Sequence, residues 1–323
     1  MAYRSKSPER VRRELAELSA QGSTLHFGFV DNIIDTAYLE RLFPALRDEG
    51  LDYRLFFEVK SNLSRAQIRD MADAGVRRMQ PGIESLSSHV LGLMRKGVRA
   101  AQNVNVLRWG RHYGIDVSWN FIYGFPNETA EDYRMQAELI PNLVHLQPPI
   151  GHGRIWMERF SPIFTERDAF PLKWMAPERD LSYIYPPQVD LGELAYFFDY
   201  ELEHTLPDAA FEEVGKAVDA WRRSTARAEG PSLTVQRADG FILIVDGRDP
   251  EVVGVHRFEG PLAALYLGLM DKPLTAKAVG EGLCLPHRVD EVTEALEEFV
   301  ARGLMMRDGN LFLSLALPAG SRR

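Results

Sequence analysis

The stretch 115–144, IDVSWNFIYGFPNETAEDYRMQAELIPNLV, holds the clearest strand of the chain and a helix soon after it. The strand is expected over 115–125, and it runs into the chain-breaking residues Gly124 and Pro126. The helix is expected over 131–144, because its apolar residues recur on one face: Tyr133, Ala137, Ile140 and Val144. This strand–turn–helix unit raises the question of what binds at the strand end.

The same alternation of strand and helix fills the first half of the chain. At this spacing it predicts βαβ units and a parallel sheet, closed into a barrel or left open. In either arrangement ligands bind at the carboxyl ends of the strands. The further strands are expected over 24–32, 53–62, 77–85 and 145–149, and the helices over 8–20, 37–50, 64–76, 88–97 and 99–114.

The second half has a different composition. Aromatic residues and prolines crowd 165–200, which predicts an irregular layer packed over the barrel, and a helix is expected over 207–228. A small module follows, with two strands around Asp239-Gly240, helices over 261–270, 275–282 and 289–302, and a closing strand over 311–317, which is a winged-helix pattern. The expected division is therefore 1–164, 165–230 and 231–323.

Charge and cysteine content exclude several classes of protein. The 323 residues carry a net charge of -8, which argues against a nucleic-acid or membrane-surface partner, and the acidic helix of the module argues against DNA binding. With no spanning apolar run and no secretory signal, a cytoplasmic location is expected. The single cysteine, Cys284, excludes an internal disulfide and a thiolate cluster within the chain, so no metal ligand is predicted.

Polar residues follow the expected strand ends. Glu58, Lys60 and Asn62 alternate along one strand and therefore face one side, which indicates a polar ligand site or, alternatively, an interior ion pair. Gly82 permits close approach of a ligand to the backbone. Glu84 or Ser85 could then bond sugar hydroxyls, although Ser85 could equally cap a helix.

Two later segments add candidates of the same kind. The backbone at 122–125 could bond a flat heterocycle, although an ordinary loop would look the same. Arg159 could pair with a carboxylate or lie on the surface. No histidine has ligand spacing, so His26, His145 and His152 are interpreted as structural.

These segments together resemble the radical SAM enzymes. Within them the chain is similar to the cobalamin-dependent C-methyltransferases that mature ribosomally made peptides. The similarity covers roughly residues 1–200 and rests on these phrases: MAYRSKSPERV, FVDNIID, EVKSNL, QPGIESLSSHVLGLMRKGV, WNFIYGFPNET, HLQPP and RFSP.

The resemblance implies a partial (β/α)6 barrel that holds S-adenosylmethionine against a [4Fe-4S] cluster, with methylcobalamin delivering a methyl group to a precursor peptide. Carried over by motif, the adenine would lie at Ile122, Gly124 and Glu128, and the ribose and methionine part at Gly82, Glu84 and Ser85. Glu58, Lys60 and Asn62 would line the cofactor cavity. Candidates for substrate contacts are Asp31, Asn32, Gln147 and Arg159.

Two parts of the family pattern do not occur in this sequence: the C-x-x-x-C-x-x-C loop after the first strand and the cobalamin-binding domain before it. The expectation is therefore an N-terminally truncated form, missing its first barrel strand, unable to ligate its cluster and poorly soluble because the edge at 24–31 is unpaired. An alternative is a non-catalytic protein that binds a precursor peptide through 231–323. A third reading is an unrelated barrel enzyme that uses Glu58 and Lys60 for acid–base chemistry.

Overall fold

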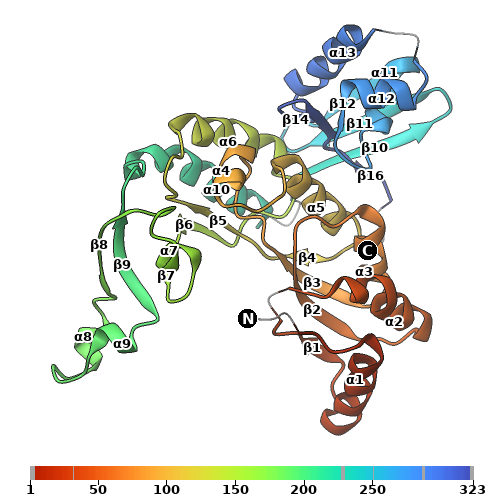
Figure 1. Cartoon of the computed structure of the whole chain (residues 1–323). Coiled ribbons are helices and arrows are strands. Elements are labelled where there is room, and N and C mark those ends of the chain that lie inside the picture. Colours follow the sequence, from red (N-terminus) through yellow and green to blue (C-terminus); the bar gives the residue numbers. More distant parts are fainter. Residues whose placement is uncertain (1–3, 32, 227–229, 250, 286–287, 321–323) are drawn as a thin grey trace.

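The first half of the chain is an α/β unit built on parallel strands. The computed structural model describes residues 4–31, 33–226, 230–249, 251–285 and 288–320. Figure 1 shows a curved row of strands with helices along its outer side and the other side open. The strands are β1 (His26–Gly28), β2 (Arg54–Val59), β3 (Val76–Pro81), β4 (Asp116–Val117), β5 (Asn120–Tyr123) and β6 (Gly151–Arg154).

The helices of this half begin where the sequence places capping residues. Ser7 accepts a hydrogen bond from the backbone N–H of Arg10, and Ser64 and Gln67 form a capping box. Thr129 and Asp132 do the same for α6. The helices are α1 (Pro8–Gly22), the π-helical turn η1 (Tyr38–Leu42), α2 (Phe43–Glu49), α3 (Arg65–Asp73), α4 (Ser88–Leu93), α5 (Ala100–His112) and α6 (Ala130–Leu143).

The strand expected over 115–125 is split between two sheets. β4 continues the sheet β1-β2-β3-β4, whereas β5 pairs with β6, and one bridge from Glu84 to Phe121 connects the two. The chain bends at Trp119, whose indole N–H donates to the carbonyl of Gln147 at 3.0 Å. Because the apolar residues continue through the bend, hydrophobicity alone does not show it.

The prediction of a strand over 145–149 is wrong. Pro148 and Pro149 have no N–H group to donate to a neighbouring strand, and the strand begins only at Gly151. Gln147 instead bridges the bend: its side-chain oxygen accepts from Val117 N–H, and its amide donates to the Ile115 carbonyl, both at 3.1 Å.

A segment that we call the arm, residues 155–206, leaves the end of β6. The sequence predicts an irregular layer here, but the structure has a three-stranded antiparallel sheet in the order β7-β9-β8. Figure 1 shows β8 and β9 projecting from the parallel sheets, so much of the arm faces solvent. Its elements are β7 (Met157–Glu158), α7 (Pro162–Thr165), β8 (Leu172–Pro177), α8 (Leu181–Ile184), α9 (Leu191–Leu194) and β9 (Phe197–Leu202).

The helix expected over 207–228 begins as a 3-10 turn, η2 (Asp208–Phe211), and continues as α10 (Glu212–Thr225). Its buried face includes Trp221, whose indole N–H donates to the Leu146 carbonyl at 3.1 Å. This helix packs on α6 and returns the chain from the arm to the main body. Among the helices of the described ranges, none is both long and apolar enough to cross a bilayer.

The C-terminal module has the predicted hairpin and three helices. β10 (Ser232–Ala238) and β11 (Phe241–Gly247) turn at Gly240, where φ is +79°. The structure adds three strands that were not expected from the sequence: β12 (Gly254–Glu259), β14 (Met305–Asp308) and the short β13 (Leu274–Thr275). The remaining elements are α11 (Gly260–Gly268), α12 (Ala276–Gly282), α13 (Val289–Ala301), β15 (Leu311–Ser314) and β16 (Leu317–Pro318).

The single closing strand expected over 311–317 is in fact two strands, since β15 pairs with β13 and β14 while β16 pairs with β10. The backbone carbonyls between these two strands accept hydrogen bonds from a side chain of the main body. Arg108 on α5 donates to the carbonyls of Leu315 and Ala316, at 3.3 and 3.0 Å. The same fully buried guanidinium donates to the Met270 carbonyl and to Asn105. The module is therefore fixed to α5.

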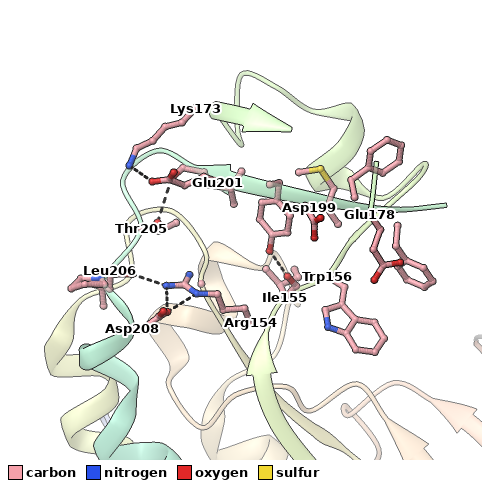
Figure 2. A pocket seen from close by; sticks show the side chains of 17 residues that line it. Arg154, Ile155, Trp156, Lys173, Glu178, Asp199, Glu201, Thr205, Leu206 and Asp208 are labelled. Carbon is pink, nitrogen blue, oxygen red and sulfur yellow. Dashed lines mark hydrogen bonds and ion pairs between the residues drawn. The ribbon is translucent and has the colours of Figure 1, made fainter. Parts of the chain in front are cut away.

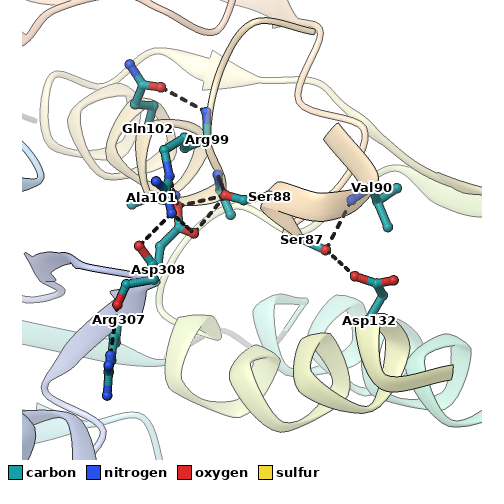
Figure 3. A network of polar contacts seen from close by, with 11 residues as sticks. Ser87, Ser88, Val90, Arg99, Ala101, Gln102, Asp132, Arg307 and Asp308 are labelled. Carbon is teal, nitrogen blue, oxygen red and sulfur yellow. Dashed lines mark hydrogen bonds and ion pairs between the residues drawn. The ribbon is translucent and has the colours of Figure 1, made fainter. Parts of the chain in front are cut away.

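A second contact between module and main body lies at the start of α5. Figure 3 shows Asp308 of β14 receiving hydrogen bonds from Arg99, Ser88 and the backbone of Ala101. Burial alone would raise the pKa of Asp308, but these donors outweigh burial and hold the pKa below its usual value. The carboxylate is thus charged and satisfied at neutral pH.

Candidate functional site

A cavity of about 710 Å³ opens at the carboxyl ends of β2, β3 and β5, and we call it the strand-end cavity. Its size lies within the range of small-molecule sites. Six of the predicted cofactor residues line it, from separate segments of the chain: Glu58, Lys60, Asn62, Gly82, Glu84 and Ile122. The parallel topology brings them together, because parallel strands end at one edge.

The β2 residues show why alternation identified this face. Leu55, Phe57 and Val59 are buried on the helix side, whereas Glu58 is partly exposed and Lys60 is exposed on the opposite side. Glu58 and Lys60 form no ion pair with each other in the described part of the chain, although both line the cavity. Their charges are therefore available to a ligand with charged groups of its own.

Close packing shapes the floor of the cavity around Gly82. A Cβ at this position would lie 3.0 Å from Lys96 Nζ. The Lys96 ammonium is held at 2.6 Å from the carboxylate of Glu84, which has a left-handed backbone with φ +59°. A larger residue at 82 would push into the cavity or displace this ion pair.

Three other predicted cofactor residues lie outside the strand-end cavity. Ser85 is buried and donates to the side-chain oxygen of Gln136 at 2.9 Å. Gly124, with φ +98°, donates its N–H to the buried carboxylate of Glu128 at 2.9 Å. Burial raises the pKa of Glu128, and the hydrogen bonds that it accepts only partly oppose this rise. Glu128 therefore holds the turn after β5.

The predicted substrate residues do not gather at one place. Asp31 is exposed, and Asn32 lies outside the described residues. Gln147 bridges the bend between β4 and β5, as described above. Arg159 donates to the Ala195 carbonyl at 2.6 Å, with its guanidinium 5.1 Å from the Phe198 ring centre. Arg159 thus braces the arm.

A larger cavity, of about 930 Å³, was not predicted from the sequence, and we call it the arm cavity. It lies between β6, β9 and the segment leading to η2 (Figure 2). The crowded aromatic residues of the arm are the feature of the sequence that relates to this cavity, but they do not indicate which strands of the arm pair with each other. Its lining includes Gly124, Arg154, Trp156, Lys173, Glu178, Phe197, Asp199, Tyr200, Glu201 and Asp208.

The residues present do not fit a [4Fe-4S] cluster. Such clusters are held by cysteine thiolates, and the one cysteine of this sequence, Cys284, is exposed in the C-terminal module. Across the described ranges there is also no group of three His, Cys, Asp or Glu side chains placed to hold a metal ion.

The strand-end cavity does fit S-adenosylmethionine by its donor set. A carboxylate, an ammonium group and two amides, from Glu58, Lys60, Asn62 and Gln80, line the same space as the apolar side chain of Ile122. The cofactor carries a carboxylate and an ammonium group at its amino-acid end and a flat aromatic ring with polar edges at the other. Complementary groups for each part are present.

The first part of the chain is similar to known proteins. Residues 1–140 match the radical SAM superfamily. An uncharacterized methyltransferase of Pyrococcus horikoshii is 28% identical over 133 residues, which is 40% of this chain and 29% of that protein. A putative methylthiotransferase of Methanocaldococcus jannaschii is 34% identical over 59 residues, 18% of this chain and 13% of that protein. The chain thus spans less than a third of these relatives.

Solved structures with detectable similarity include two radical S-adenosylmethionine enzymes. The methyltransferase TsrM of Kitasatospora setae is 15% identical with a TM-score of 0.48, covering 67% of this chain and 47% of that one. The cobalamin-dependent enzyme OxsB is 19% identical with a TM-score of 0.40, covering 46% of this chain and 24% of that one.

Proposed function

We propose, from the premise that residues 1–140 are a radical SAM superfamily segment, that the strand-end cavity binds S-adenosylmethionine and that the chain serves a methyl-transfer reaction. One observation carries the first part: six predicted cofactor residues from separate segments line a single cavity of about 710 Å³. The match to an uncharacterized methyltransferase supports the second part.

Each part of the cofactor has a partner in this assignment. The Lys60 ammonium binds the carboxylate of the methionine end, and the Glu58 carboxylate binds its amino group. Asn62 and Gln80 bond the ribose hydroxyls, and Ile122 packs against the adenine. The bound cofactor supplies an activated sulfonium carbon, while these residues orient it and restrict its contact with water.

In its finer form, the proposal names the acceptor as a carbon of a ribosomally made precursor peptide and the methyl carrier as cobalamin. Both rest on the sequence resemblance. The [4Fe-4S] cluster of the superfamily has no ligand set in the residues given, so no step of the proposal is assigned to it.

A second candidate function, a non-catalytic binder of a precursor peptide, is favoured by the module. β12 is the edge strand of its sheet, and three neighbouring apolar residues are strongly exposed there: Val252, Val253 and Val255. An extended peptide can add to such an edge through backbone hydrogen bonds. Peptide binding that is abolished by a proline in place of Val255, with no S-adenosylmethionine binding, would favour this function over the first.

Calorimetric titration of the whole chain with S-adenosylmethionine tests the leading proposal. Lys60→Met removes one charged partner, and we expect it to weaken binding about tenfold, as hydrogen bonds to charged groups are worth about 1.5–3 kcal/mol. Gly82→Ala should weaken binding similarly, because its Cβ would lie 3.0 Å from Lys96 Nζ. Gly92→Ala is the matched control, since its Cβ would meet no atom within 4 Å. Binding that is absent, or equal in all three variants, would contradict the proposal.

A further inference from the structure

The arm cavity has two ends with different character. Figure 2 shows Arg154, Asp208, Lys173 and Glu201 on one side, and Trp156, Glu178 and Asp199 on the other. On the first side every charge is already paired: Arg154 lies 2.7 Å from Asp208, and Lys173 lies 2.6 Å from Glu201. This side offers little net charge to a ligand.

The second side carries uncompensated negative charge. The Glu178 carboxylate makes no hydrogen bond or ion pair within the described part of the chain, and Asp199 accepts only the backbone N–H of Arg179, at 3.0 Å. Neither carboxylate forms an ion pair with a Lys, Arg or His side chain of the described residues. A ligand that reaches this side therefore gains by carrying positive charge.

The same side presents an aromatic face. The Trp156 side chain is 72% exposed, although it lines the cavity, and its ring centre lies 5.7 Å from that of Phe197 in an edge-on arrangement. A large aromatic ring that remains in solvent next to carboxylates is suited to a planar cation, which stacks on the ring while the acids bond its N–H groups.

We propose that the arm cavity binds an arginine side chain of an extended peptide. The guanidinium stacks on Trp156 and donates to Glu178 and Asp199. At about 930 Å³ the cavity lies near the upper end of the range for small-molecule sites, so one side chain does not fill it and residues flanking the arginine occupy the rest.

The inference deepens the proposed function and rests on it in one respect. Gly124 lines the arm cavity while Ile122 lines the strand-end cavity, so a peptide held in the arm cavity and the cofactor contact residues only two apart in the chain. Binding of the peptide itself requires no cofactor, which allows the two claims to be tested apart.

Calorimetric titration of the full chain with three probes tests the assignment. The probes are the blocked tripeptide Ala-Arg-Ala, the same tripeptide with neutral citrulline in place of arginine, and free butylguanidinium. We expect the arginine peptide to bind, and each of the other two to bind at least about tenfold more weakly. Equal affinity for citrulline would overturn the charge argument, and equal affinity for butylguanidinium would overturn the peptide assignment.

Variants locate the binding. Glu178→Gln should weaken binding of the arginine peptide about tenfold, in line with the strength of charged hydrogen bonds, and Trp156→Ala about threefold, in line with exposed cation–π contacts. Glu213→Gln and Tyr183→Ala are matched controls, since both residues are exposed and neither lines the cavity. Unchanged affinity in the first pair would overturn the proposal. The two claims are separated by titrating the native chain with each ligand. Binding of S-adenosylmethionine without binding of the peptide refutes only this inference, and binding of the peptide without the cofactor refutes only the cofactor site. Glu178→Gln should bind S-adenosylmethionine as the native chain does.

Discussion

The strand-end cavity and the arm cavity border the same short segment, at Ile122 and Gly124, yet they are built in different ways. The first stands on parallel sheets whose apolar side is continuous with the large core and with the module docked on α5. The second stands on an antiparallel sheet with a separate cluster of buried residues: Phe125, Met157, Ile163, Phe170, Ala195, Phe198 and Leu202. The main body should therefore unfold as a unit, whereas the arm can open on its own.

The largest effect is expected at the contact that joins module and main body. Arg108→Met keeps the volume but leaves the carbonyls of Met270 and Ala316 without this donor, while the Leu315 carbonyl keeps only its contact with His145. We expect the free energy of unfolding to fall by about 3–5 kcal/mol, because each buried unsatisfied group costs about 1–3 kcal/mol. Urea unfolding measures this loss. Arg111→Met, an exposed arginine on the same helix, is the control, and an equal loss there would contradict the role of Arg108.

A pH dependence of the free energy of unfolding is also expected from a buried histidine of the main body. Burial lowers the pKa of His145 to about 3, and its Nε2 lies 3.1 Å from the Leu315 carbonyl of the module. The unfolded chain takes up this proton below about pH 6.5, whereas the folded chain does so only near the lowered pKa. The contribution of His145 to the free energy of unfolding is therefore fully present above pH 6.5. It falls by about 1.4 kcal/mol per pH unit from there toward pH 3.

His145→Gln removes this titration, so the difference in unfolding free energy between native chain and variant should shrink as the pH falls from 6 to 4. His26→Gln, at an exposed histidine, should leave the slope unchanged. A slope that is the same in the native chain and in both variants would rule out His145 as its source.

A smaller and local effect is expected in the arm. Phe198→Ala removes a buried ring that contacts Phe164, at 5.0 Å between ring centres, and the Arg159 guanidinium. We expect a loss of about 2–3 kcal/mol, below the usual cost of such a change in a large core, because the cluster is small. Hydrogen exchange should rise in β8 and β9 but not in β2 and β3.

Phe160→Ala is the control for the arm, since this ring is 77% exposed. If hydrogen exchange in β2 and β3 of Phe198→Ala rises along with that in β8 and β9, the main body and the arm unfold together and the arm does not open on its own.

The same contrast explains what the sequence could predict. Residues two apart on a strand share a face, and parallel strands end at one edge, so local pattern and topology together predicted that Glu58, Lys60 and Gly82 meet at one edge, where they line one cavity. The parallel sheet and most helix bounds follow from the same rules and from capping residues such as Ser64.

The features that escaped prediction depend on contacts between distant parts of the chain. The bend at Trp119 is fixed by Gln147, and Arg108 reads as an ordinary surface residue until the backbone of the module covers it. The arm sheet forms because β8 pairs with β9 across two short helices, which no local period reveals. Antiparallel pairing over such a distance is set by packing rather than by neighbouring residues.

The position of β5 has a consequence for how ligands in the two cavities affect each other's affinity. Ile122 of this strand borders the strand-end cavity, and Gly124, just past the strand end, borders the arm cavity. A molecule that shifts this short backbone on one side alters the fit on the other. Thermodynamic linkage then requires the coupling to be reciprocal: whatever factor the cofactor imposes on peptide affinity, the peptide imposes on the cofactor.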